Sequence, residues 1–225
     1  MKFTYLGHAC FMIENNNHQL LFDPFITPNP LIENFDLNQL NPNYILISHG
    51  HEDHLADAET IAKKNNSKII SNYEIVTWYG AKGVEGHPMN HGGKWSFDFG
   101  TVKYVNAIHS SGLPDGSYGG QPGGFILDFD GKIIYYSGDT ALFSDMQLFG
   151  EQYKIDLAVL PIGDNFTMGI EDAVLAAKKL NCKKVIGVHF NTFPYIEINK
   201  QEAINQFNSN GIELILLNIE ESINI

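Results

Sequence analysis

The chain has 225 residues, 44% of them hydrophobic, which is enough for a sizeable core in a single domain spanning residues 1–225. Its formal net charge is −12 and all of its basic residues are lysines, which argues against a nucleic-acid partner because binding a polyanion needs a basic face. No signal segment follows Met1 and no apolar run approaches the roughly 20 residues that cross a bilayer, so we predict a soluble cytoplasmic protein without a membrane partner.

Hydrophobic periodicity predicts two β-rich runs, each followed by alternating strands and helices. In the first half we expect strands at 3–6, 10–14, 19–23, 44–47 and 68–71, helices at 55–65 and 72–79, and a polar loop at 86–93. In the second half we expect hairpins at 94–109 and 124–137, helices at 141–149, 171–180 and 200–208, and strands at 157–161, 184–189 and 212–217. This order predicts an α/β (α+β) protein in which two mixed β-sheets pack face to face with helices outside, a four-layer αββα sandwich.

The stretch 48–54, Ser-His-Gly-His-Glu-Asp-His, concentrates metal ligands directly after a predicted strand. Imidazole nitrogens and a carboxylate suit zinc and similar divalent ions. In a turn, His49 and His51 can converge on one ion, which leaves Asp53 and His54 for a second. The alternative is a solvated histidine cluster with Asp53 capping the following helix, but a cap needs one side chain and not four. Two sites of four or five ligands require further ligands from elsewhere in the chain.

Three further candidates follow predicted strands. His109 ends a strand, where a ligand is held rigidly. Asp139 follows a glycine-facilitated turn, and a carboxylate there can offer two oxygens to bridge two metals, although it can also cap the helix predicted at 141–149. His189 ends an apolar strand, where a core histidine is the usual interpretation, but an incomplete second site favours a metal ligand.

Other polar residues are candidates for supporting roles. His8 lies in the turn after the first strand and either contacts the substrate or ties one loop to another. Asp23 is interpreted as orienting a ligand histidine or as bonding loop amides, and Thr140 is placed in the same supporting set. His87 and His91 are weaker candidates for contacting a metal or the substrate.

Two segments are candidates for contacts with the substrate. Residues 110–122 are rich in glycine and form either a mobile flap beside the site or a plain surface loop. Residues 164–169 precede a helix and either present backbone amides to an anion or simply cap that helix.

The motif His49-Gly50-His51-Glu52-Asp53-His54 resembles the signature of the metallo-β-lactamase-fold hydrolases. The similarity continues through residues 7–9, 23–24, 107–110, 137–140 and 187–189. This set most resembles the uncharacterised metal-dependent hydrolases related to the ascorbate-6-phosphate lactonase type. The resemblance implies the αββα metallo-β-lactamase fold and a ligand set with three parts: His49, His51 and His109 on one metal, Asp53, His54 and His189 on the other, and Asp139 as the bridge.

The resemblance also implies the chemistry. Two divalent transition-metal ions, zinc by preference and manganese, nickel or iron as compatible alternatives, would activate water against a small ester, lactone or phosphoester. Asp53 and His8 are the catalytic candidates, with Asp53 orienting the nucleophile and His8 meeting the substrate. A small-molecule phosphodiesterase or RNA-processing nuclease of the same fold and a non-catalytic metal sensor or scaffold are the alternatives. A di-iron redox protein is disfavoured, because that type typically replaces one of the early histidines with glutamate, whereas residue 51 is histidine.

Overall fold

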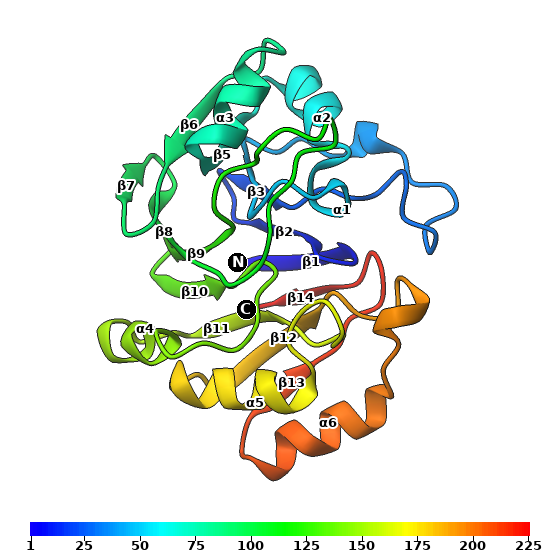
Figure 1. The fold of residues 1–225 in the computed structure, drawn as a ribbon, viewed down its shortest axis with the longest axis vertical. Coiled ribbons are helices and arrows are strands. Elements are labelled where there is room, and N and C mark those ends of the chain that lie inside the picture. The colour runs from blue at the N-terminus through cyan, green and yellow to red at the C-terminus, as the bar shows by residue number, and fades with distance from the viewer.

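A computed structural model describes residues 1–225 as two seven-stranded β-sheets packed face to face between two helical layers (Figure 1). This confirms the predicted αββα sandwich. The helices are α1 (Glu52–Leu55), α2 (Ala58–Asn65), α3 (Tyr73–Gly80), α4 (Met146–Gln152), α5 (Ile170–Lys179) and α6 (Lys200–Ser209). Figure 1 shows α2 and α3 above the first sheet and α4, α5 and α6 below the second. None of the helices has the length and apolar content needed to span a bilayer.

The first sheet has the strand order β14-β1-β2-β3-β4-β5-β6. Its strands are β1 (Lys2–Gly7), β2 (Cys10–Glu14), β3 (Gln19–Phe22), β4 (Tyr44–Leu46), β5 (Lys68–Asn72), β6 (Gly86–Met89) and β14 (Ser222–Asn224). Strands β14, β1, β2 and β3 pair antiparallel, whereas β3 to β6 pair parallel. The sheet is therefore mixed, with the parallel strands joined by helical crossovers.

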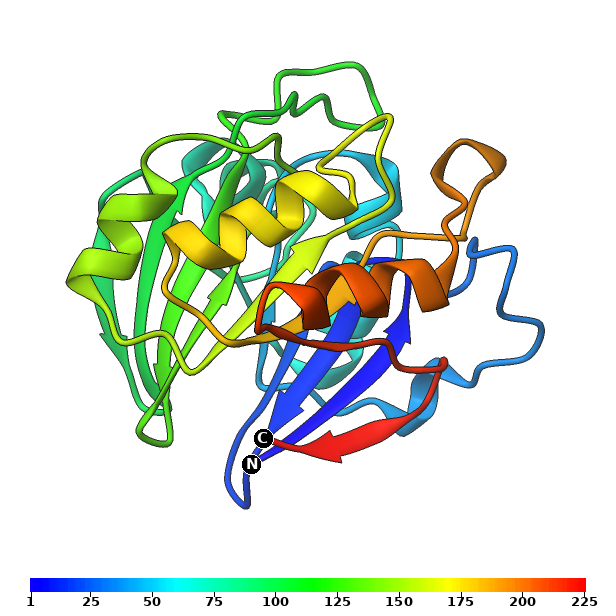
Figure 2. The ribbon, with the colours of Figure 1, turned by 90° about the horizontal axis from the view of Figure 1, so that it is seen from below.

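The second sheet has the order β13-β12-β11-β10-β9-β8-β7. Its strands are β7 (Lys94–Phe97), β8 (Gly100–Asn106), β9 (Gly123–Phe129), β10 (Lys132–Tyr136), β11 (Leu157–Pro161), β12 (Lys184–Val188) and β13 (Glu213–Ile215). Strands β7 to β10 pair antiparallel and β10 to β13 pair parallel. These directions bring the carboxyl ends of β1, β3, β4, β8, β10, β11 and β12 to one edge of the sandwich. In Figure 2 the loops at this edge lie at the end opposite the two chain termini.

Aromatic side chains fill the space between the sheets. Phe11 stacks on Phe22 with ring centroids 4.3 Å apart, and Tyr136 from the second sheet meets both rings edge-on at 5.0 and 5.7 Å. All three side chains are buried, and one further apolar cluster lies between each sheet and its helices. The interior is therefore continuous through all four layers.

The helix after the metal motif differs from the prediction of 55–65. It begins at Glu52 with His51 as its N-cap, stops at Leu55 and resumes as α2. The break follows from Asp57, whose carboxylate accepts hydrogen bonds from the backbone of Ile26 and Thr27 instead of capping α2. Asp53 therefore lies inside the first turn of α1. The alternative prediction, in which Asp53 caps a helix that starts at Leu55, is wrong.

Four other boundaries differ from the prediction. Residues 86–93 are not all loop, because residues 86–89 form β6, which pairs with β5 and tolerates Pro88 as the edge strand of its sheet. Strand β8 ends at Asn106, so His109 lies in a loop. Residues 141–145 are not helical because the Ala141 amide bonds the Ile108 carbonyl, and α4 begins later. Strand β14 was not predicted, because it has only three residues and its alternation is too short to indicate a strand.

Candidate metal centre

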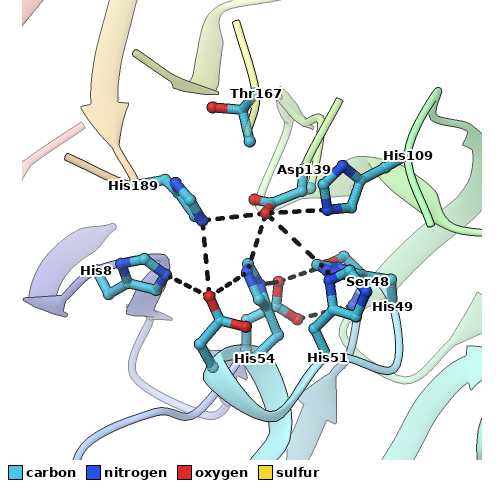
Figure 3. Close-up of polar contacts among 12 residues, drawn as sticks. His8, Ser48, His49, His51, His54, His109, Asp139, Thr167 and His189 are labelled. Atoms are coloured by element: carbon cyan, nitrogen blue, oxygen red, sulfur yellow. Dashed lines mark hydrogen bonds and ion pairs between the residues drawn. The ribbon is translucent and has the colours of Figure 1, made fainter. Parts of the chain in front are cut away.

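The candidate ligands converge at the carboxyl edge of the two sheets (Figure 3). They come from both sheets, and each follows a strand: His8 after β1, Asp23 after β3, the motif 49–54 after β4, His109 after β8, Asp139 after β10 and His189 after β12. Open α/β sheets bind ligands at this end of their parallel strands. The fold therefore gathers into one place residues that are up to 181 positions apart in the sequence, from His8 to His189.

One group of side chains comprises His49, His51 and His109. A ligand nitrogen from each lies within 4.8 Å of the others. The closest pair is His49 Nε2 and His51 Nδ1 at 2.9 Å, and the ring of His109 lies edge-on to both. Ser110 Oγ lies 3.2 Å from His51 Nε2, which leaves Nδ1 of His51 facing the other two rings.

A second group comprises Asp53, His54, His189 and His8, whose ligand atoms also lie within 4.8 Å of one another. Asp53 Oδ2 lies 3.8 Å from both His54 Nε2 and His189 Nε2. His54 and His189 are buried with nearly parallel rings, at an interplanar angle of 19°. Both groups match the donor chemistry of divalent transition metals, namely imidazole nitrogen and carboxylate oxygen.

Asp139 lies between the two groups. Its Oδ2 atom is 3.0 Å from His189 Nε2 and 3.3 Å from His54 Nε2. The same atom is 3.6 Å from His109 Nε2 and 4.0 Å from His49 Nε2. One buried carboxylate oxygen therefore faces two histidines of each group.

Asp23 orients the rings from beneath. Its carboxylate accepts hydrogen bonds from His54 Nδ1 at 2.8 Å, from the backbone and hydroxyl of Ser48, and from the phenol of Tyr136. The Ser48 hydroxyl oxygen in turn lies 2.9 Å from His49 Nδ1. With Nδ1 engaged, His54 presents Nε2 to the centre, where it is buried and has no hydrogen-bond partner. A buried nitrogen of this kind fits a metal ion, which would satisfy its lone pair.

His8 supports Asp53 in a comparable way. Its Nε2 lies 3.0 Å from Asp53 Oδ2 and its Nδ1 lies 2.9 Å from the hydroxyl of Thr192. Burial, reinforced by the neighbouring His189, lowers the pKa of His8 to about 4, so the ring is neutral and carries one proton. That proton belongs on Nε2, because a carboxylate can only accept, and Thr192 then donates to Nδ1. Thr192 was not predicted as part of the site, because it lies 184 positions from His8.

Three of these residues have left-handed backbone conformations: φ is 54° at His8, 40° at Asp23 and 56° at His189. Such a conformation costs about 1–3 kcal/mol for a residue other than glycine and concentrates at functional sites. The backbone itself compensates at one point, where the His189 amide donates to the His8 carbonyl at 2.8 Å. The three strained backbone positions therefore lie where the polar side chains of the candidate site converge.

The carboxylates control the protonation of His54 and His189. Burial disfavours the charged form of His189, but the adjacent Asp139 outweighs it and raises the pKa of His189 to about 9. For His54 the effect of burial is likewise overcome by Asp139 and Asp53, which raise the pKa of the ring well above its usual range. Protons and metal ions compete for the same nitrogens in such a site.

The remaining candidates lie at or outside the periphery. The Thr140 hydroxyl accepts a hydrogen bond from the Ile108 amide and so fixes the backbone next to His109 without touching a ligand side chain. His87 packs against Trp95 and Phe97, and His91 bonds the carbonyl of Pro122, so neither joins the two groups of candidate ligands.

The loop at 110–122 is held by hydrogen bonds near both of its ends. The amide of Asn72 donates to the carbonyls of Gly119 and Gln121, and the Ser111 hydroxyl also donates to Gly119. The Trp78 indole donates to Asp115 near the middle of the loop. These bonds attach the loop to α3 beside the site.

Comparison with known proteins places the chain in a family. A protein-family model described as the beta-lactamase superfamily domain matches residues 18–190 of the chain. A protein of Flavobacterium johnsoniae named UPF0173 metal-dependent hydrolase is 54% identical over 225 residues, which cover 100% of both chains. The chain belongs to the UPF0173 metal-dependent hydrolases of the beta-lactamase superfamily. It is therefore an enzyme, and the family resemblance of its motifs is confirmed.

Other members of this family are similar over most of their length. The UPF0173 metal-dependent hydrolase YtkL of Bacillus subtilis is 49% identical over 202 residues, 88% of each chain. Among solved structures, Igni18, described as a novel metallo hydrolase from the archaeon Ignicoccus hospitalis, is 35% identical. It superposes with a TM-score of 0.90 over 99% of this chain and 97% of its own.

Proposed function

We propose that this hydrolase cleaves small esters, lactones or phosphoesters at a dinuclear metal centre built from residues of one domain, 1–225. The ligands fall into three parts: His49, His51 and His109 for the first ion, Asp53, His54 and His189 for the second, and Asp139 shared by both. Zinc is the first choice of metal, and manganese, nickel and iron suit the same donors. The main support is the position of Asp139 Oδ2, which lies within 4.0 Å of four histidine Nε2 atoms, two from each set of candidate ligands.

When bound, two divalent ions lower the pKa of water toward neutrality and polarise the bond to be cleaved. The chain needs no nucleophile of its own for this reaction. Burial raises the pKa of the Cys10 thiol well above its usual range, and Cys182 is buried as well. The Ser48 hydroxyl is buried and donates to Asp23. These side chains therefore serve structure, and water is the attacking group.

Asp53 is the proposed proton acceptor. His8 donates to Oδ2 and fixes the plane of the carboxylate, while the protein makes no hydrogen bond to Oδ1. Oδ1 is thus free to accept the proton that water loses as it attacks. The His8 ring is fully buried and both of its nitrogens are engaged, so we assign it a positioning role through Asp53 in place of direct contact with the substrate.

Metal analysis tests this assignment. We expect wild-type protein to bind close to two ions per chain, and His109→Ala and His189→Ala each to bind close to one. His91→Ala is the matched control, because His91 lies outside both groups, and it should retain two ions and full turnover. Two ions retained in His189→Ala, or full activity in His51→Ala, would reject the dinuclear assignment.

A further inference from the structure

We propose that the substrate is an uncharged ester or lactone with an apolar group next to the bond that is cleaved, and that phosphorylated molecules are poor substrates. This inference rests on the proposed function of the metal centre and narrows its substrate class. It follows from two independent features of the loops around the centre, namely exposed apolar side chains and the absence of cationic ones.

Exposed apolar side chains lie on three of the loops that follow the converging strands. Ile108 directly precedes His109 and is 55% exposed, and Tyr118 in the same loop is 61% exposed. Phe166, after β11, is 51% exposed, and Tyr195, after β12, is 74% exposed. We call these four residues the apolar rim. Exposed apolar groups gathered beside a polar centre are typical of a ligand site.

The rim is connected to the metal-binding groups. The rings of Phe166 and Tyr195 contact each other edge-on with centroids 6.1 Å apart, so two of the loops meet. Thr167, the next residue after Phe166, lies over Asp139 in Figure 3. An apolar group that covered the rim would release water from its rings, at about 25 cal/mol per Å² of apolar surface buried.

The second feature is the charge of the same loops. None of the fourteen lysines lies in the loops that follow the converging strands, which are 8–9, 23–43, 47–51, 107–122, 137–145, 162–169 and 189–199. These loops do carry carboxylates outside the metal-binding groups, including Asp115, Asp164 and Glu197. Proteins recognise phosphate mainly with arginine, lysine or free helix amides. The first two of these are missing here.

The helix amides are also unavailable. Helix α5 starts after Gly169 at the end of the 162–169 loop, where an anion might bind. The Asp164 carboxylate lies directly beside Gly169, and the first turn of α5 adds Glu171 and Asp172. These side chains complement the positive end of the helix themselves and repel another anion. The anion-binding interpretation of residues 164–169 is therefore not supported.

One lysine adjoins these loops. Lys200 is the first residue of α6, and its ammonium lies 5.5 Å from the centroid of the Phe190 ring. It contacts no residue of the metal-binding groups or the rim and provides the control variant below.

The acidic loops also suit the chemistry of the products. Hydrolysis adds water across the acyl C–O bond and gives an alcohol and a carboxylic acid, which loses its proton at neutral pH. An uncharged ester approaches without repulsion, whereas the carboxylate product is repelled by the loops and leaves.

The test compares substrates that share a leaving group. We expect kcat/KM to rise about tenfold from p-nitrophenyl acetate to p-nitrophenyl butyrate, since each added methylene contributes up to about 0.8 kcal/mol. Bis(p-nitrophenyl) phosphate should be cleaved more slowly than either ester. Phe166→Ala and Tyr195→Ala should abolish the preference for butyrate without loss of bound metal, and Lys200→Gln should change nothing. Faster cleavage of the phosphate, or an unchanged butyrate preference in both rim variants, would overturn the inference.

A binding measurement separates this inference from the proposed function. Saturation-transfer NMR should detect N-phenylbutyramide, an uncharged and slowly hydrolysed analogue, on wild-type protein as purified. The signal should fall several-fold in the Phe166→Ala Tyr195→Ala double variant. If the dinuclear assignment fails, metal analysis reveals it while this binding persists. If the rim does not select apolar groups, the amide fails to bind or binds the double variant equally well.

Discussion

The backbone amide of His189 donates to the carbonyl oxygen of His8 at 2.8 Å, and the two imidazole rings lie 4.1 Å apart. His8 follows β1 of the first sheet and His189 follows β12 of the second, so this bond joins the sheets at the edge where the ligands converge. The positions of the two rings are therefore linked. We consequently expect substitutions of residues that hold His8, such as Thr192, to lower turnover without removing a candidate ligand.

The first prediction concerns Thr192. Thr192→Val removes the hydroxyl that donates to His8 Nδ1, so the ring keeps its bond to Asp53 but loses one of the two hydrogen bonds that hold it in place. We expect kcat to fall about tenfold, in the lower part of the range for residues that support a metal site. KM should stay unchanged. Thr192→Ser keeps the hydroxyl and should restore most of kcat.

The Nδ1 atom of His8 provides a second measurement for this prediction. Nitrogen-15 NMR of histidine-labelled protein should show the proton on Nε2 in all three proteins, because Asp53 accepts it in each. The Nδ1 resonance should shift in Thr192→Val, which lacks the hydrogen bond to this atom, and stay in place in Thr192→Ser. If Thr192→Val keeps both the Nδ1 shift and kcat, the hydroxyl has no positioning role.

The second prediction concerns Asp23. Asp23→Asn places an amide nitrogen where the carboxylate accepts hydrogen bonds from His54, Ser48 and Tyr136. We expect metal affinity to fall about 10- to 100-fold, as is usual for the partner of a ligand histidine. Competition with a chromophoric chelator measures the affinity. Tyr136→Phe removes one donor and leaves the carboxylate, so it should have the smaller effect, and the reverse order would contradict the role assigned to Asp23.

The third prediction concerns pH and metal removal. The pKa of His189 is about 9 in the folded metal-free chain, above its value of about 6.5 in an unfolded chain. The pairing of His189 with Asp139 thus stabilises the metal-free fold fully below pH 6.5, and this stability is lost as the pH rises through 9. We expect Tm in excess chelator to fall over that interval.

Metal-loaded protein should behave in the opposite way, because ligand histidines must be neutral to bind and affinity rises as they lose protons. Thermal unfolding monitored by circular dichroism, with and without chelator, gives both curves. His189→Gln lacks one of the two rings with a raised pKa and should make the metal-free curve shallower, while His54 keeps part of the slope. A metal-free Tm that increases from pH 7 to 9 would contradict the pairing with Asp139.

The fourth prediction concerns nucleic acid. The net charge of −12 and the absence of lysine from the loops at the site leave no basic surface beside the candidate ligands that would displace counterions from a phosphate backbone. We expect no submicromolar binding of precursor transfer RNA at near-physiological salt in a filter-binding assay. Metal-dependent cleavage at a defined position in the RNA would contradict this and favour a nuclease.

The sequence predicted most of the fold and the position of the candidate site, for identifiable reasons. His49 and His51 are close along the chain, so their convergence is a local property that the motif shows directly. His109, Asp139 and His189 are distant, but parallel strands bring their carboxyl ends together once a sandwich is assumed. The assignment of these residues as ligands remains a prediction for metal analysis.

The features that the sequence did not reveal depend on contacts between distant segments. Thr192 reaches His8 because the loop after β12 packs beside the end of β1. The helical break at Asp57 arises from its bonds to the loop at 26–27. Ala141 lies outside α4 because its amide bonds Ile108. Local propensity describes none of these contacts, because each partner alone is compatible with several conformations.

The bond from Tyr136 to Asp23 crosses between the sheets directly beneath the candidate ligands. Phe11 packs against Tyr136 and against Phe22, the residue before Asp23, so the order of the metal site rests on aromatic rings in the interior. A Phe11→Ala cavity, at about 3–5 kcal/mol, would therefore loosen the ligands as well as the core. In evolutionary terms, substitutions in this part of the core and substitutions in the metal site are not independent. Selection for turnover also acts on core residues that never contact the substrate.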